Sequence, residues 1–215
     1  MTDTGPQLLF QVSNSSMEAF NQHLFLVLNA QQQSQPLVIW FAIIMAKYAI
    51  FCIPLIMLKG WLGKSEAHHK IMLTALLATV GALLINNLIG SLIWYHPRPF
   101  VMPLGHTLIS HAPTPSFPSN HMTIVSTVAF SFILRPALRK TGVALAVLAL
   151  PIAWSRIYLG VHFPLDMLGA VIVAGVASLM MLWLQPLYLE TLYGVTRGVY
   201  RIVFSPLIAR GLLHR

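Results

Sequence analysis

Five long apolar runs limit what this chain can fold into more than any other feature. They cover residues 37–58, 71–94, 122–138, 143–158 and 168–187. About 20 apolar residues in a helix cross the roughly 30 Å hydrocarbon core of a bilayer, so each run is a candidate span. Only 8% of the residues are charged, against about a quarter in soluble domains. The runs therefore predict an all-α, polytopic membrane helix bundle with about five transmembrane helices.

An amphipathic helix is predicted ahead of the first span. Met17, Phe20, Leu24 and Leu28 recur at helical spacing, which is typical of a helix lying in the membrane interface. We therefore divide the chain into three parts. These are residues 1–36, a polar segment and interfacial helix; 37–187, the transmembrane domain; and 188–215, a basic cytoplasmic tail.

The distribution of positive charge predicts the orientation. The formal net charge is +8, but no basic arm is present, so we expect no nucleic-acid partner. With five spans, most cations fall on one side, which the positive-inside rule makes cytoplasmic. The C-terminus is then cytoplasmic and the N-terminus outside. The clusters are Lys59, Lys64 and Lys70; Arg135, Arg139 and Lys140; and Arg197, Arg201, Arg210 and Arg215.

Ionisable residues gather on the opposite, outer side. Charged groups at membrane depth are costly and by default mark function. The residues concerned are His96, Arg98, His106, His111, His121, Arg156, His162 and Asp166.

Several of these residues suit the binding of a phosphoryl group without a metal. Arg98 and Arg156 can each offer a planar fork of N–H donors to phosphoryl oxygens. Ser119 or Asn120 is placed as the N-cap of the third span, where backbone N–H groups and the helix dipole favour an anion. We expect these four residues to bind phosphate.

The remaining residues suit phosphoryl transfer. His162 and Asp166 are four residues apart, with Pro164 suited to a helix start between them. A carboxylate on one imidazole nitrogen fixes the tautomer and leaves the other nitrogen nucleophilic. His121 is then free to act as the acid.

Three short motifs, in this order and spacing, resemble the signature of the type 2 phosphatidic acid phosphatase superfamily. They are Arg98-Pro99, Pro118-Ser119-Asn120-His121, and Ser155-Arg156 followed by His162 and Asp166. The resemblance implies a phosphohistidine on His162, a leaving group protonated by His121, and no metal or other cofactor. Two positions depart from the family pattern. Ser91 stands where the family has a lysine, and Asn120 where it usually has glycine.

Within the superfamily, residues 98–119 and 152–162 are similar to the bacterial undecaprenyl-diphosphate phosphatases linked to bacitracin resistance. This similarity implies a polyprenyl diphosphate substrate, hydrolysed to undecaprenyl phosphate and phosphate. It also implies a bacterial plasma membrane location, with the site on the outer side. The sequence does not indicate an oligomeric state.

Other substrates and residues stay open. Glycerolipid phosphates are alternative substrates, with hydrolysis or phosphotransfer, and a non-enzymatic lipid transporter is an alternative of another class. Lys47, His96, His106 and His111 are candidate substrate contacts. Two alternatives are open for Lys47. It faces the bundle interior, where its charge would replace the lysine missing at Ser91, or it snorkels or pairs with a backbone carbonyl. The histidines lack the spacing of a zinc site.

Overall fold

The computed structural model describes residues 16–63 and 65–210, and every regular element in these ranges is helical. The prediction of an all-α fold is therefore confirmed. Three short helical turns interrupt or end the longer helices: η2 (Ala49–Phe51), η3 (Ile89–Ile93) and η4 (Pro136–Leu138). The α-helices are α1 (Ser16–Leu28), α2 (Pro36–Lys47), α3 (Cys52–Leu62), α4 (Glu66–Leu88), α5 (Asn120–Ile133), α6 (Arg139–Tyr158), α7 (Pro164–Trp183), α8 (Gln185–Val203) and α9 (Ser205–Ala209).

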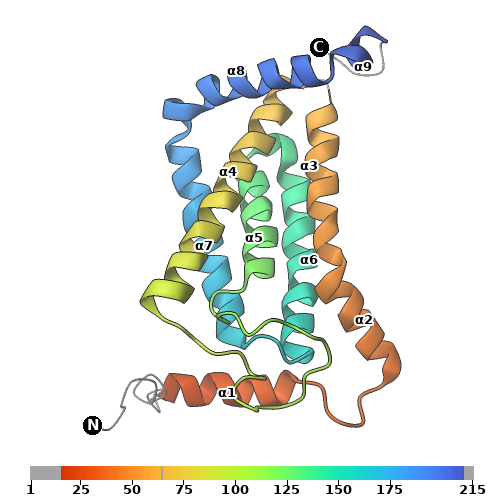
Figure 1. Cartoon of the computed structure of the whole chain (residues 1–215), viewed down its shortest axis with the longest axis vertical. Helices are drawn as coiled ribbons and strands as arrows, with labels where there is room; N and C mark the ends of the chain where they lie inside the picture. Colours follow the sequence, from red (N-terminus) through yellow and green to blue (C-terminus); the bar gives the residue numbers. More distant parts are fainter. Residues whose placement is uncertain (1–15, 64, 211–215) are drawn as a thin grey trace, which may run out of the picture.

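Helices α2 to α7 form an upright bundle, with α1 lying across one end and α8 across the other (Figure 1). Four helical stretches of the described chain are long and apolar enough to cross a membrane. Helix α5 is shorter, and it packs against α4, α6 and α7 in the middle of the bundle. Because its neighbours shield it from lipid, α5 does not need to match the full hydrocarbon thickness. The four stretches are Pro36–Leu62, Glu66–Ile93, Pro136–Tyr158 and Pro164–Trp183.

Helices α2 and α3 together form the first predicted span, with an interruption between them. Helix α2 ends at Lys47, a 3-10 turn follows, and α3 begins at Cys52. Pro54 lies in the first turn of α3, where its missing N–H leaves the carbonyl of Ile50 without a helical partner. The interruption is therefore a proline effect.

Proline also explains two span ends that differ from prediction. Helix α5 ends at Ile133 rather than near 138, because the residue before Pro136 is driven into an extended conformation; Arg135 has φ −119° and ψ 117°. The run 168–187 is divided between α7 and α8, since Pro186 lies at the start of α8. A proline is well tolerated there and poorly inside a helix.

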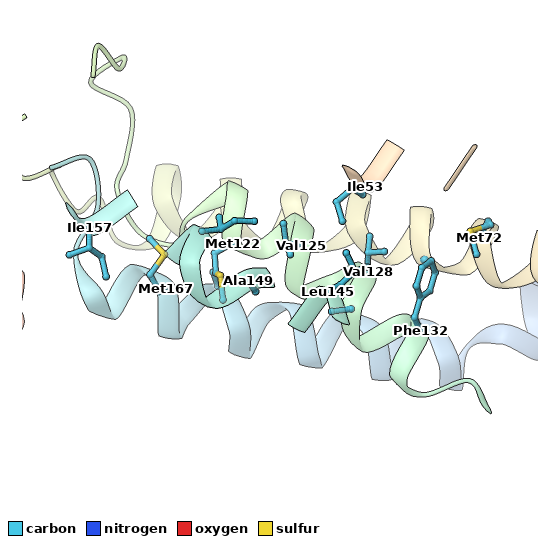
Figure 2. Packing of buried hydrophobic residues seen from close by; sticks show 14 of the residues in the cluster. Ile53, Met72, Met122, Val125, Val128, Phe132, Leu145, Ala149, Ile157 and Met167 are labelled. Carbon is cyan, nitrogen blue, oxygen red and sulfur yellow. The ribbon is translucent and has the colours of Figure 1, made fainter. Parts of the chain in front are cut away.

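The core of the bundle is apolar and closely packed (Figure 2). Val125, Val128 and Phe132 of α5 are at most 1% exposed. Gly142 lets α6 approach α5 closely, because a Cβ there would lie 2.6 Å from the backbone nitrogen of Ile133. Small residues at helix contacts are the usual way that membrane helices gain packing area.

Two connections meet at the end of the bundle that α1 crosses (Figure 1). The loop 94–119 leads from α4 to α5, and the short segment 159–163 joins α6 to α7. The backbone N–H of Leu108 donates to the carbonyl of Leu159 at 3.1 Å. Gly160 has φ +80°, and a Cβ there would lie 2.1 Å from the His106 carbonyl. A side chain at position 160 would collide with the loop 94–119, so glycine is required there.

The basic residues lie as predicted at the opposite end. Lys70 of α4 forms ion pairs with Glu66 and with Glu190 of α8, at 2.9 and 2.7 Å. Arg135, after α5, donates to Gln185 at the start of α8. Lys64, Arg215 and residues 1–15 lie outside the described residues.

Candidate active site

His162 and Asp166 meet where α7 begins. Pro164 is the first residue of α7, and the Asp166 carboxylate caps the helix by accepting from the backbone N–H of Phe163 at 2.8 Å. The same oxygen, Oδ2, lies 3.1 Å from Nδ1 of His162. Both side chains are at most 2% exposed. The predicted contact between these two side chains is confirmed.

The partners of His162 assign its tautomer. Nδ1 faces a carboxylate, which only accepts, and Nε2 lies 3.1 Å from Nη1 of Arg98, which only donates. Nδ1 therefore carries the proton and Nε2 presents its lone pair. Burial lowers the pKa of His162 to about 3, although the hydrogen bond and the charge of Asp166 oppose this shift. A buried, neutral imidazole with an unprotonated Nε2 is suited to nucleophilic attack once substrate takes the place of Arg98 at that nitrogen.

Ser116 is a member of this cluster that the sequence did not single out. Its Oγ donates to Oδ2 of Asp166, and the residue is fully buried. Oδ2 thus accepts from three donors, which hold the carboxylate in place beside His162. No motif spacing marks Ser116; its position in the loop 94–119 becomes informative only when the loop is folded against α7.

Arg98 is held by the loop on which it lies. Nε donates to the carbonyl of Thr114 at 2.9 Å, and Nη2 donates to Thr114 Oγ1 and to the carbonyl of Pro115. Nη1 also donates to the carbonyl of Val161 at 2.8 Å. Burial lowers the pKa of Arg98 to about 10, and Asp166 opposes the shift. The guanidinium therefore stays charged at neutral pH, directly beside His162.

Arg156, in the last turn of α6, has few partners. It is 2% exposed, and its one hydrogen bond within the described chain runs from Nη1 to the carbonyl of Ala46 at 3.5 Å. Nε and Nη2 have no partner there. An unpaired buried guanidinium is costly, so these two donors are suited to an anionic ligand.

The N-terminus of α5 contributes a further polar group. Ser119 is the N-cap residue and is fully buried, yet its Oγ has no hydrogen-bond partner among the described residues. Its backbone N–H donates to the carbonyl of Asp166 at 3.2 Å, which fixes α5 against α7. Asn120 is exposed, and its side-chain oxygen accepts from Asn86 of α4 at 2.9 Å. Because that oxygen is occupied, the groups of Asn120 that suit an anion are its N–H donors.

Two further histidines lie beside the cluster. His121, in the first turn of α5, is half-buried and close enough to Arg156, His111 and Arg98 to interact with their charges. The ring of His111 lies 6.3 Å from that of His162, and its Nδ1 lies 2.9 Å from the carbonyl of Ala112. Burial lowers the pKa of His111.

Two predicted contacts lie away from the cluster. His106 is exposed, and its backbone, not its ring, is bound by Asn29, the residue after α1. Lys47 is exposed, which contradicts the alternative in which it faces the bundle interior. The buried positions of α2 are Ala42 and Ala46, four residues apart, and Lys47 lies one residue, or about 100°, further round the helix. Ser91 is also exposed and donates to Asn87.

His96 lies deeper than expected for a substrate contact. It is 2% exposed, with Nε2 3.3 Å from Glu18 of α1 and Nδ1 4.0 Å from Asp166. The sequence does not indicate this role for Glu18, because a carboxylate three residues after a serine at a helix start is typical of a capping box. Within residues 16–63 and 65–210, no group of three or more His, Cys, Asp or Glu side chains is arranged to hold a metal ion.

Comparisons with known proteins agree with this arrangement. Residues 71–189 match the PAP2 superfamily. The chain is 37% identical over 197 residues to "Putative undecaprenyl-diphosphatase YbjG" of Escherichia coli, covering 91% of this chain and 98% of that protein. It is 39% identical over 132 residues to undecaprenyl-diphosphatase BcrC of Bacillus subtilis, covering 61% and 67%.

A solved structure shares the fold. The transmembrane PAP2-type phosphatidylglycerolphosphate phosphatase of Bacillus subtilis superposes with a TM-score of 0.59 at 19% identity, over 84% of this chain and 92% of that one. The segment that matches the PAP2 superfamily, residues 71–189, runs from the first turns of α4 into α8. It contains every residue of the cluster described above except Glu18. The chain is a multi-pass membrane protein that belongs to the PAP2 superfamily.

Proposed function

We propose that the protein is a phosphatase that hydrolyses undecaprenyl diphosphate to undecaprenyl phosphate and inorganic phosphate. One observation carries the proposal. The lone pair of His162 Nε2 lies beside Arg98, at an end of the bundle where Arg156 and Ser119 also bury polar atoms that have no partner among residues 16–63 and 65–210. Two relatives that are 37% and 39% identical are named for this substrate.

The first step is transfer of the terminal phosphoryl group to His162. Nε2 attacks the terminal phosphorus, a P–N bond forms, and the P–O bond to the bridging oxygen breaks. His121 gives its proton to the departing lipid phosphate. Arg98 and Arg156 neutralise the charge on the equatorial oxygens, and the N–H groups at the start of α5 add to this. Positioning and electrostatic stabilisation of this kind dominate phosphoryl transfer.

The second step is hydrolysis of the phosphohistidine. Water attacks the phosphorus, the P–N bond breaks, and His121 takes the proton of the water. His162 returns to the neutral tautomer that Asp166 holds through Nδ1. The imidazole of His162 gains positive charge in the first step and loses it in the second, and Asp166 stabilises the charged form between them.

We place this site on the outer side of the bacterial plasma membrane, with α8 on the cytoplasmic side. The basic residues at the α8 end support this orientation through the positive-inside rule. Exposed positions at the two ends, Gln33 and Gly198, allow a test as single cysteines in a Cys52→Ser background. A membrane-impermeant maleimide should label Gln33→Cys, but not Gly198→Cys, in intact cells or spheroplasts. The opposite pattern would reverse the orientation.

Phosphate release tests the activity. Detergent-purified protein is given undecaprenyl diphosphate with EDTA present, alongside His162→Ala. His23→Ala, at an exposed position on α1, is the matched control. We expect release by the parent and the control, and loss in His162→Ala. Release only from glycerolipid phosphates would keep the mechanism and overturn the substrate. Binding without any release would favour a transporter, and loss with EDTA would contradict the metal-free mechanism.

A further inference from the structure

The buried face of α1 carries two polar side chains beside Phe25, whereas large apolar side chains of the same helix are exposed. Glu18 and Asn21 are 8% and 2% exposed, whereas Met17 and Phe20 are 66% and 57% exposed. The side-chain oxygen of Asn21 accepts from the backbone N–H of Leu165 at 3.0 Å, one residue before Asp166. The polar face of α1 is thus fitted to the first turn of α7.

His96 lies between this face of α1 and Asp166. Its Nε2 is 3.3 Å from Oε2 of Glu18, and its Nδ1 is 4.0 Å from Oδ1 of Asp166. The ring is held on its sides by Trp94 and Phe163, with ring centroids 5.1 Å away in both cases. Each nitrogen of His96 therefore faces a carboxylate oxygen, and neither makes a hydrogen bond of normal geometry in the described chain.

The two oxygens of Asp166 have different surroundings. Oδ2 accepts from Ser116, Phe163 and His162, whereas Oδ1 is buried and has no hydrogen bond within the described chain. Oδ1 is therefore the part of the carboxylate still open to a donor. A donor to Oδ1 would add a fourth hydrogen bond to the Asp166 carboxylate and further restrict the direction of its bond to His162.

We propose that His96 and Glu18 are positioning residues for phosphoryl transfer, which hold Asp166 through Oδ1 and so orient His162. The chain of contacts runs Glu18–His96–Asp166–His162 and joins α1 to the nucleophile. The gap between Nδ1 and Oδ1 exceeds a hydrogen bond by about 1 Å, and catalytic hydrogen bonds that are long without substrate shorten when it binds. The proposal rests on the proposed function in taking His162 as the nucleophile.

Kinetics of Glu18→Gln and His96→Gln test the proposal. Both changes keep a side chain of similar length, and His23→Gln, at an exposed position of α1, is the matched control. Because a misplacement of about 1 Å can cost around 100-fold in rate, we expect kcat to fall about 10- to 100-fold. KM should change by less than about 3-fold, since neither residue is proposed to touch phosphate. Thermal unfolding should stay close to that of the parent.

A second readout requires no substrate. ¹⁵N NMR of histidine-labelled protein in detergent micelles reports which nitrogen of His162 carries the proton. The parent and His23→Gln should show protonated Nδ1, and the Glu18 and His96 variants should show a mixture of tautomers. If His96→Gln fails to fold, Glu18→Gln alone tests the proposal.

Unchanged kcat in Glu18→Gln, or lower kcat with the parent tautomer retained, would overturn the positioning role. A parent that releases no phosphate from any lipid would overturn the proposed function instead. The NMR comparison would still decide whether Glu18 and His96 orient His162.

Discussion

Replacement of Arg156 by methionine should separate activity from stability. Nε and Nη2 of Arg156 are buried without partners in the described chain, and Nη1 makes one long bond, 3.5 Å, to the carbonyl of Ala46. The side chain therefore contributes little to the folded state, and its buried charge costs stability. Arg98 is the opposite case, because it donates to Thr114, Pro115 and Val161 as well as to His162.

The magnitudes follow from these contacts. Two charge-assisted hydrogen bonds to a phosphoryl group contribute about 1.5–3 kcal/mol each. Their loss in Arg156→Met should lower kcat/KM by about 10²- to 10⁴-fold, at roughly 1.4 kcal/mol per factor of ten. Replacing a poorly compensated buried charge by an apolar side chain of similar volume is often neutral or stabilising, by about 1–4 kcal/mol. Arg156→Met should therefore unfold at the same temperature as the parent or higher.

The assay pairs Arg156→Met with Arg98→Met. Phosphate release from undecaprenyl diphosphate gives kcat/KM, and intrinsic fluorescence during heating in detergent gives the unfolding temperature. Both variants should lose activity, but only Arg98→Met should lose stability, because it leaves three backbone carbonyls without their donor. If Arg156→Met unfolds as early as Arg98→Met, or keeps activity within about 3-fold of the parent, the assignment of Arg156 as a phosphate ligand is refuted.

Four further outcomes are expected. Ser116→Ala should lower kcat about 10-fold in the phosphate assay, since it removes one of three donors to Asp166; parent-like kcat would contradict this. His162 is nucleophilic when neutral and burial lowers its pKa, so kcat/KM should fall only when the pH is well below 6.5. A fall in kcat/KM centred at pH 6.5 would refute the assignment of His162 as the nucleophile. Gly142→Leu should overpack α5 against α6 and lower the free energy of unfolding by about 1–3 kcal/mol. The unfolding temperature should fall with it, and parent-like melting would count against that contact. Lys47→Met should leave KM unchanged, and a raised KM would restore Lys47 as a substrate contact.

The all-α bundle could be predicted because apolar runs and proline positions act locally. A run long enough to cross a bilayer must satisfy its own backbone hydrogen bonds, and a helix does this without any tertiary partner. The grouping of cations at the α8 end could be predicted as well, because the order of spans along the chain puts these connections on one side of the membrane. Helix ends were predicted less well. Pro54, Pro136 and Pro186 each break or end a helix inside a continuous apolar run, and hydropathy does not register the missing N–H.

Part of the candidate site could also be predicted from local spacing. Asp166 follows His162 by four residues, and a helix that begins at Pro164 brings the two together whatever the rest of the fold does. Arg98, Arg156 and Ser119 lie on three different segments, and they were assigned to one site from motif spacing and a shared side of the membrane. The structure places them at one end of the bundle.

What the sequence by itself determined is therefore the helical class, the shared end of the motif residues and the His162–Asp166 pair. Only the tertiary structure decided the neighbours of that pair. Ser116 and His96 reach Asp166 across the folded loop 94–119, and Glu18 reaches His96 from a helix whose exposed side chains are mostly apolar. The outward direction of Lys47 was decided in the same way, by the rotation of α2 against α6. These contacts join residues far apart in the chain, so they depend on packing angles and helix rotations that no local pattern records.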